Sequence, residues 1–235
     1  MKKLKKIAVT LAVVLLVGCV IGGTLAFLTD KTDTVTNTFV AAGGPGPFVE
    51  TFVLKEYKVD QSSTGKYTPT TEEVTANTYG KVMPGTVIPK EVFVRLSRTG
   101  VTQSGETVIP APAYLYLEVV DDLDKTEYTW SVNDDWLKLG SVKADDGTSS
   151  DIYLYVGEYA DDKHVLTTVP ADTTIDVITG NCVNVKDVEL KEGEFKLSFN
   201  AYLAQASTGN TDDPVEVFWA CFKKTITPVS TGNGN

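Results

Sequence analysis

From residue 48 onward, apolar and polar residues alternate with a period of two in short segments that turn-forming residues separate. Because successive side chains of a strand point to opposite faces of a sheet, this alternation predicts half-buried β-strands. Five such segments stand out: 91–96, 113–120, 152–156, 195–203 and 215–221. In the fourth, Phe195, Leu197, Phe199, Ala201 and Leu203 share one face.

No long stripe with helical spacing accompanies these strands, and only 134–139 and 205–213 have room for a turn of helix. Val215, Val217, Trp219 and Cys221 share one face if 215–221 is the last strand. The pattern therefore predicts a mainly β fold, a single antiparallel β-sandwich of jelly-roll type over 48–225 with at most short helical turns. The polar end of the chain, 226–235, is expected to be a disordered tail.

Residues 1–26 form a separate apolar block before this pattern begins. Residues 1–6 carry four lysines and residues 7–26 carry no charge, which is typical of an export signal peptide. Thr24 and Ala26 provide the small residues that a signal peptidase accepts, which predicts cleavage before Phe27. We therefore expect a secreted protein, extracellular or associated with the cell surface.

Two alternatives to this cleavage stay open. Leu16-Val17-Gly18-Cys19 has the form of a lipobox, which would make Cys19 a lipidated N-terminus. The apolar run is also close to the roughly 20 residues that a membrane-spanning helix needs, so it is compatible with an uncleaved anchor.

The stretch after the leader is rich in threonine and contains Val35, Phe39 and Val40, a composition that favours an extended strand over a helix. It ends at Gly43-Gly44-Pro45-Gly46-Pro47, where glycine frees the backbone and proline removes amide donors. Residues 27–42 are therefore expected to be an N-terminal strand arm, and 43–47 a hinge.

The charge of the chain bears on its partners. The net charge is −10, and removing residues 1–26 takes away four lysines and no acidic residue, which makes it −14. An acidic body without a run of positive charges is repelled by phosphates, so we expect no nucleic-acid binding.

Two cysteines, Cys182 and Cys221, remain after the leader is removed. An extracellular location permits a disulfide between them, but the sequence does not show whether their Cα atoms come close enough. Two separate buried thiols are the alternative.

Catalytic patterns are scarce. His164 is the only histidine, and its neighbours form no motif, so neither a Ser-His-Asp triad with a recognisable setting nor an HExxH zinc site is present. The many carboxylates include no pair that spacing selects for glycoside hydrolysis. We therefore expect a protein that is not an enzyme.

Two further patterns allow binding. Asp145-Asp146-Gly147 with Asp151 offers the oxygens that calcium prefers, without EF-hand spacing, although turn-forming, solubilising loop tips are the commoner explanation of such doublets. We expect no cofactor, with calcium as the alternative. Aromatic residues on two predicted strands would bind a sugar or a protein partner if exposed, or pack in the core if buried: Tyr114, Tyr116, Tyr153 and Tyr155.

The junction at 20–43, VIGGTLAFLTDKTDTVTNTFVAAG, resembles the leader and mature start of the TasA and camelysin (CalY) family, secreted proteins that the signal peptidase SipW processes. The matching residues are Gly22, Gly23, Thr24, Ala26, Phe27, Thr29, Asp30, Asn37, Thr38 and Phe39. Weaker similarity continues at Val82-Met83-Pro84-Gly85-Thr86, Pro112-Ala113-Tyr114-Leu115 and in 201–206. The hinge is longer than the family's single glycine.

The resemblance implies a structural subunit of biofilm-matrix fibres that assembles by donor-strand exchange. The arm of one copy would add to an open sheet edge of the next, through Phe27, Leu28, Val35, Phe39 and Val40. It also implies processing by a SipW-type peptidase and a sibling matrix subunit as partner. Two alternatives are a monomer whose arm folds back onto its own sheet, and a surface module that binds carbohydrate or a host protein.

Overall fold

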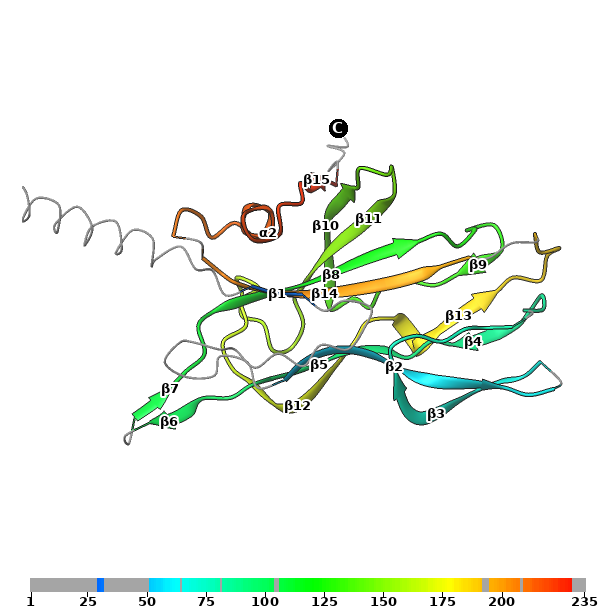
Figure 1. The fold of residues 1–235 in the computed structure, drawn as a ribbon, viewed down its shortest axis with the longest axis horizontal. Coiled ribbons are helices and arrows are strands. Elements are labelled where there is room, and N and C mark those ends of the chain that lie inside the picture. Colours follow the sequence, from blue (N-terminus) through cyan, green and yellow to red (C-terminus); the bar gives the residue numbers. More distant parts are fainter. Residues whose placement is uncertain are drawn as a thin grey trace, which may run out of the picture.

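The computed structural model describes residues 29–31, 51–63, 65–80, 82–103, 106–191, 195–207 and 209–229. The predicted signal peptide and the predicted hinge lie outside these residues, as does all of the predicted arm except 29–31. Antiparallel strands dominate the described chain, so the expected mainly β, sandwich-like fold is confirmed (Figure 1). No helix in this part of the chain is long and apolar enough to cross a membrane.

The larger sheet has six strands in the order β1-β14-β8-β11-β10-β15 (Figure 1). Its strands are β1 Thr29–Lys31, β8 Ala113–Asp121, β10 Trp136–Lys143, β11 Ser149–Tyr155, β14 Leu197–Gln205 and β15 Thr227–Pro228. The predicted strands 113–120 and 195–203 pair with each other as β8 and β14 over the whole of β14.

A four-stranded sheet in the order β12-β5-β2-β3 faces the larger one (Figure 1). Its strands are β2 Thr51–Gln61, β3 Tyr67–Val74, β5 Val92–Arg98 and β12 Val169–Asp176. A small sheet and a hairpin complete the strands: β4 Val87–Pro89, β13 Cys182–Val185 and β9 Tyr128–Thr129, then β6 Val101–Gln103 with β7 Glu106–Val108. One 3-10 turn, η1 Thr179–Asn181, precedes β13.

One apolar core fills the space between the two large sheets. Leu115, Leu117 and Val119 project from one face of β8 and belong to the same buried cluster as Val94 and Leu96 of β5. Burial of a side chain of this size contributes about 1.5–3 kcal/mol, so this cluster is what holds the sheets together. The predicted inward face of 113–120 is confirmed.

The prediction of a last strand at 215–221 is wrong, because this segment is the helix α2, Pro214–Phe222. The carboxylate of Asp213 accepts hydrogen bonds from the N–H groups of Val215 and Glu216 at 2.9 and 3.1 Å, and Pro214 occupies the first turn. Both features start helices. With nine residues, α2 also exceeds the short turns that we expected.

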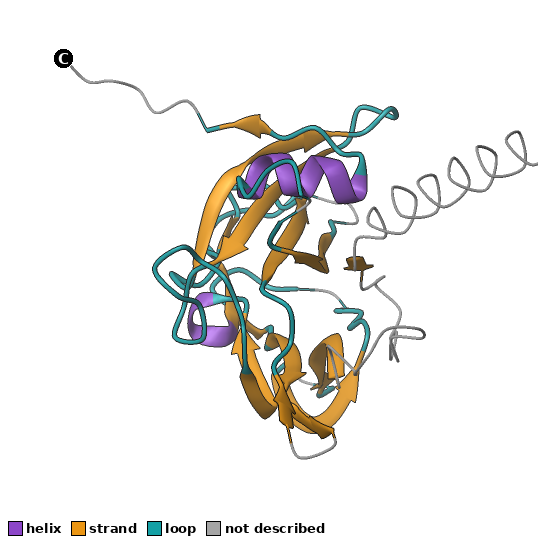
Figure 2. Cartoon of the chain, turned by 90° about the vertical axis from the view of Figure 1, so that its left-hand side faces the viewer, coloured by secondary structure: helices purple, strands orange, loops and turns teal. Residues whose placement is uncertain are grey.

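α2 lies across the outer face of the six-stranded sheet (Figure 2). Val217 and Phe218 of the helix are completely buried there. Tyr114 and Tyr116, on the second face of β8, are also buried, and their hydroxyls donate to backbone carbonyls of Asp212 and Pro214 at 2.6 and 2.9 Å. The two tyrosines therefore fix the start of the helix to the sheet.

The first residues of the segment expected to be a tail belong to the fold. Ile226 is buried in the cluster under α2, and β15 pairs with Gly140 and Ser141 of β10. The two segments with room for a helical turn form none in the described chain, since Trp136 already opens β10 and no helix occurs in the described part of 205–213. Residues 230–235 lie outside the described chain.

Candidate strand-accepting groove

One edge of the larger sheet is only partly paired. β1 pairs with Tyr202, Leu203 and Ala204 of β14, and no described strand pairs with residues 197–200 on the side away from β8. Backbone groups in an antiparallel strand point alternately to its two sides. The carbonyl of Lys196 accepts a hydrogen bond from the N–H of Asp122, so the backbone groups of Lys196 point toward β8. The backbone groups of the odd-numbered residues that follow it therefore point toward the open edge. Leu197 and Phe199 are such residues.

The smaller sheet has a matching open edge on β2. Residues 51–56 pair with β5, whereas pairing with β3 begins only at Glu56 opposite Val74. On the side away from β5, no described strand accompanies residues 51–55.

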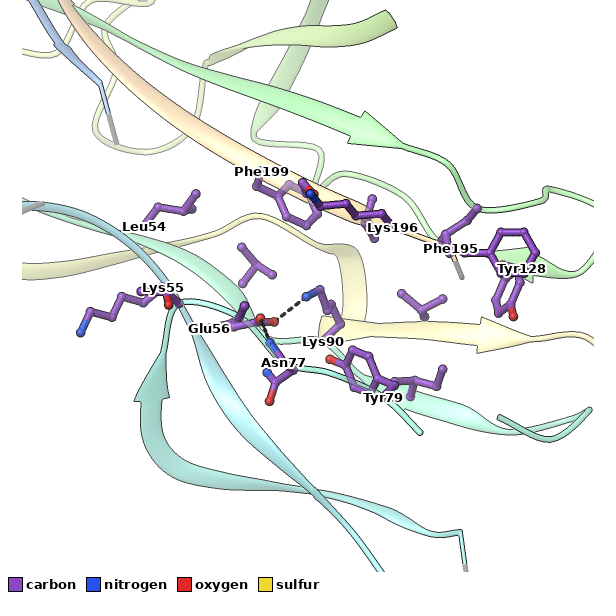
Figure 3. Close-up of a pocket in the computed structure, with 18 residues that line it drawn as sticks. Leu54, Lys55, Glu56, Asn77, Tyr79, Lys90, Tyr128, Phe195, Lys196 and Phe199 are labelled. Atoms are coloured by element: carbon purple, nitrogen blue, oxygen red, sulfur yellow. Dashed lines mark hydrogen bonds and ion pairs between the residues drawn. The ribbon is translucent and has the colours of Figure 1, made fainter. Parts of the chain in front are cut away.

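A groove of about 450 Å³ lies between these two strands (Figure 3). Its walls are mainly apolar and come from both sheets and from the small sheet at one end. The apolar lining residues are Leu54, Ala76, Tyr79, Ile88, Val92, Leu123, Tyr128, Val183, Phe195, Leu197 and Phe199. Apolar side chains delivered by an added strand would therefore find apolar partners here.

An ion pair sits on the floor of this groove. The ammonium group of Lys90 lies 2.6 Å from one carboxylate oxygen of Glu56, and the other oxygen accepts the backbone N–H of Asn77 at 2.6 Å (Figure 3). The two charged side chains are only 10% and 5% exposed. Because each charge has its partner, the floor is electrically neutral as well as mostly apolar.

The loop that carries Asn77 is fixed to a bulge in β2. The register between β2 and β3 shifts between Tyr57 and Val59, and Asn77 satisfies the groups freed there. Its amide donates to the carbonyl of Tyr57 and its side-chain oxygen accepts the N–H of Val59, both at 2.8 Å. The hydroxyl of Tyr79 donates to the carbonyl of Pro89 at 3.1 Å, and burial raises its pKa.

The sequence did not single out Glu56, Lys90 or Asn77. A local signal exists, since the alternation of β2 puts Glu56 on the same face as Phe52 and Leu54, and Glu56 is buried like Phe52. Its partner is 34 residues away, however, and no spacing rule connects the two.

The predicted cleavage and arm residues mostly lie outside the described residues. This holds for Cys19, for Thr24 and Ala26, and for the arm residues Phe27, Leu28, Val35, Phe39 and Val40. Only residues 29–31 of the arm are described, and they pair with the chain's own β14.

The two cysteines, Cys182 and Cys221, are separate free thiols and form no disulfide with each other. Cys182 lies in β13 of the small sheet, whereas Cys221 lies in α2 and packs in the cluster on the outer face of the six-stranded sheet. They are therefore held by different parts of the fold. Burial raises the pKa of the Cys221 thiol.

The acidic segment considered for calcium forms the turn of the β10–β11 hairpin. Asp146 accepts the N–H of Thr148 at 2.8 Å, and Gly147 takes the left-handed φ of 89° that the turn requires. Asp151 is bound instead by Lys138 and Ser141 at 2.6 and 2.7 Å. Within the described ranges, no group of three or more His, Cys, Asp or Glu residues gathers.

Of the two alternatives for the tyrosines of the predicted strands, packing in the core is the one found for three of the four. Tyr114, Tyr116 and Tyr155 are buried, and only Tyr153 remains partly exposed. His164 stands in a loop with a left-handed φ of 64°, beside the side chain of Asp161, which accepts the N–H groups of the residues on either side of it.

Comparison of this chain with protein-family models, with curated proteins and with solved structures found no match.

Proposed function

We propose that this chain is an exported structural protein that assembles into filaments by donor-strand exchange. In such an assembly, the N-terminal arm of one copy adds as a strand to the open edge of β14 in the next copy. The observation that carries the proposal is the pairing of residues 29–31 with β14, directly beside its uncovered stretch and the apolar groove.

Two kinds of interaction stabilise the proposed contact. Backbone hydrogen bonds to the edge of β14 contribute about 0.5–1.5 kcal/mol each, and the apolar side chains of the arm add burial in the groove. Open strand edges are otherwise a liability in soluble proteins, so an edge with a groove beside it favours a dedicated partner strand. At about 3.3 Å per residue, the arm 27–42 reaches roughly 50 Å, which is enough to cross a neighbouring sandwich.

The geometry of the exchange predicts filaments rather than closed oligomers. The arm and the edge are different surfaces of one chain, so the contact is head to tail, and such a contact propagates when its rotation does not close. The competing state is a monomer in which each arm stays on its own β14, as residues 29–31 do.

Deletion of residues 27–42 from the mature protein tests the arm. We expect the full mature protein to form filaments in electron micrographs and the deletion variant to form none while keeping its circular dichroism spectrum. Deletion of 230–235 is the matched control and should leave filaments intact. Unchanged filaments without the arm would refute the mechanism.

Leu197 allows a finer test of the acceptor edge. Proline at this position removes an N–H that faces the open edge, and it removes no bond to β8. Leu197→Ala loses the same side chain but keeps the amide. We expect Leu197→Pro to assemble at least tenfold more slowly than Leu197→Ala in light scattering, with similar stability of the two variants. Equal rates would argue against strand addition at β14.

The resemblance of 20–43 to the TasA and camelysin family supports export, cleavage before Phe27 and a place in an extracellular matrix. N-terminal sequencing of the exported protein tests this part separately. Phe-Leu-Thr-Asp at the N-terminus would support it, whereas a blocked terminus at Cys19 would favour the lipoprotein alternative.

A further inference from the structure

A second hollow, of about 510 Å³, lies on the inner face of the larger sheet and shares no residue with the first groove. The strands β10 and β11 and the end of β8 form its floor, and the loop before β10 forms its rim. No residue of the four-stranded sheet lines it. It therefore occupies the part of the inner face that the smaller sheet leaves uncovered.

The alternation of β11 explains how this hollow arises. Ile152 and Leu154 point to the outer face and are buried in the cluster that contains α2. On the inner face, Tyr155 is buried in the sandwich core, Tyr153 is partly buried, and Asp151 lies further out. The inner face thus changes from apolar core to polar rim within one strand.

Apolar and aromatic groups form one wall of the hollow. Trp130 packs edge-on against Phe199, and its indole N–H donates to Asp121 at 3.0 Å, so the ring is held in place. Tyr153 lies beside it on the floor. This wall is rigid and partly open to solvent.

Polar groups surround that wall. Asp151 is held by Lys138 and Ser141, and Asp121 is paired with Lys125, so two of the three carboxylates are neutralised. Asp134 on the rim is the third, and it has no ion pair among the described residues.

The hydroxyl of Tyr153 lies among these groups. None of the described residues forms a hydrogen bond with it. Burial raises the pKa of Tyr153 to about 12, and the nearby Asp151 and Asp121 act in the same direction. The hydroxyl therefore keeps its proton at neutral pH and remains a donor to a bound molecule.

We propose that this hollow binds a sugar unit of a polysaccharide that carries no acidic groups. A pyranose ring has an apolar C–H face that packs on aromatic rings and an edge of hydroxyls that pair with carboxylates, amides and lysines. Trp130 and Tyr153 provide the first kind of surface, and Asp134 and Asn133 lie on the rim that provides the second. The remaining negative charge of Asp134 disfavours acidic polymers.

A peptide is a poorer occupant. Two strands of the floor, β8 and β11, are paired on both sides, so they offer no backbone edge to an extended peptide. The volume lies within the roughly 300–1,000 Å³ of small-ligand sites, which suits one or two sugar units.

The test is a titration of the full mature protein, followed by tryptophan fluorescence and by isothermal calorimetry. The probes are oligomers of β-1,4-linked glucose, N-acetylglucosamine and glucosamine, with a polyuronate as the acidic comparison. We expect saturable binding of at least one non-acidic oligomer and no binding of the polyuronate. No binding by any of the three, or binding of the polyuronate alone, would overturn the proposal.

Three variants assign the binding to this hollow. Tyr153→Phe removes the free hydroxyl, and Trp130→Leu removes the aromatic face of the wall; each should weaken binding about tenfold. Tyr57→Phe, a partly buried tyrosine in β2 outside the hollow, is the matched control and should bind like the wild type. Unchanged affinity in both hollow variants would refute the site. Deletion of 27–42 should leave sugar binding intact, so this proposal and filament assembly can fail separately.

Discussion

Replacing Lys90 by methionine should destabilise the protein strongly, because it leaves a buried carboxylate without its counter-ion. The ammonium nitrogen of Lys90 lies 2.6 Å from a Glu56 oxygen, and the Glu56 side chain is only 5% exposed. At an effective dielectric constant of about 20, two charges at this distance attract each other by about 6 kcal/mol. Part of this offsets the cost of removing both charges from water, and removing one partner of a buried pair costs about 3–5 kcal/mol.

Urea unfolding followed by tryptophan fluorescence measures this cost. With a slope of about 2 kcal/mol per molar urea, the midpoint of Lys90→Met should fall by roughly 1.5–2.5 M. The double variant Glu56→Gln/Lys90→Met should recover most of the loss, since it removes both charges and leaves an amide in place of the carboxylate.

A second ion pair of the same chemistry provides the control. Lys58 lies 2.9 Å from Glu72 on the surface, with side chains that are 43% and 63% exposed. Because water screens this exposed pair, Lys58→Met should lower the urea midpoint far less than Lys90→Met does. If Lys90→Met cost no more than Lys58→Met, or if the double variant were as unstable as Lys90→Met, the ion pair would not be what stabilises the floor of the groove.

Two further predictions concern the outer face of the six-stranded sheet. Phe218→Ala should cost about 3–5 kcal/mol of unfolding free energy in the same urea experiment, because Phe218 is completely buried, whereas the half-exposed Trp219→Ala should cost far less; similar losses would mean that α2 is not packed as described. Burial pushes the pKa of Glu118 up, but hydrogen bonds from Lys224, Tyr202 and Ser150 outweigh burial and leave it below its ordinary value. Glu118 therefore stabilises the folded protein at pH values above about 4.3, the pKa of a glutamate in the unfolded chain. This stabilisation is lost as the pH falls through the lower pKa that Glu118 has in the folded protein. Glu118→Gln should flatten the acid limb of the stability curve, and an unchanged limb would contradict this assignment.

Local sequence patterns were sufficient to predict the buried face of a strand where alternation with a period of two dominated the segment. The alternation in 113–120 predicted which side chains of β8 face the sandwich core, and Leu115 and Leu117 are completely buried there. Burial of a one-sided apolar face sets the register of a strand, because a shift by one residue would expose every member of that face.

The same pattern failed at α2, where the residues of 215–221 are apolar at nearly every position and fit a strand or a helix. Asp213 and Pro214 were the local signals that favoured the helix. The tertiary structure favoured the helix, because α2 packs on the outer face of the larger sheet and covers the tyrosines there.

By itself, the sequence determined the mainly antiparallel β class and the inward faces of the main strands, since each rests on neighbours within a few positions. Only the tertiary structure decided which edges stay open, which tyrosines are buried and which charges meet. Glu56 and Lys90 are 34 residues apart, and Glu118 and Lys224 are 106 residues apart. Contacts between such distant positions follow from the way the sheets pack, and no local period encodes them.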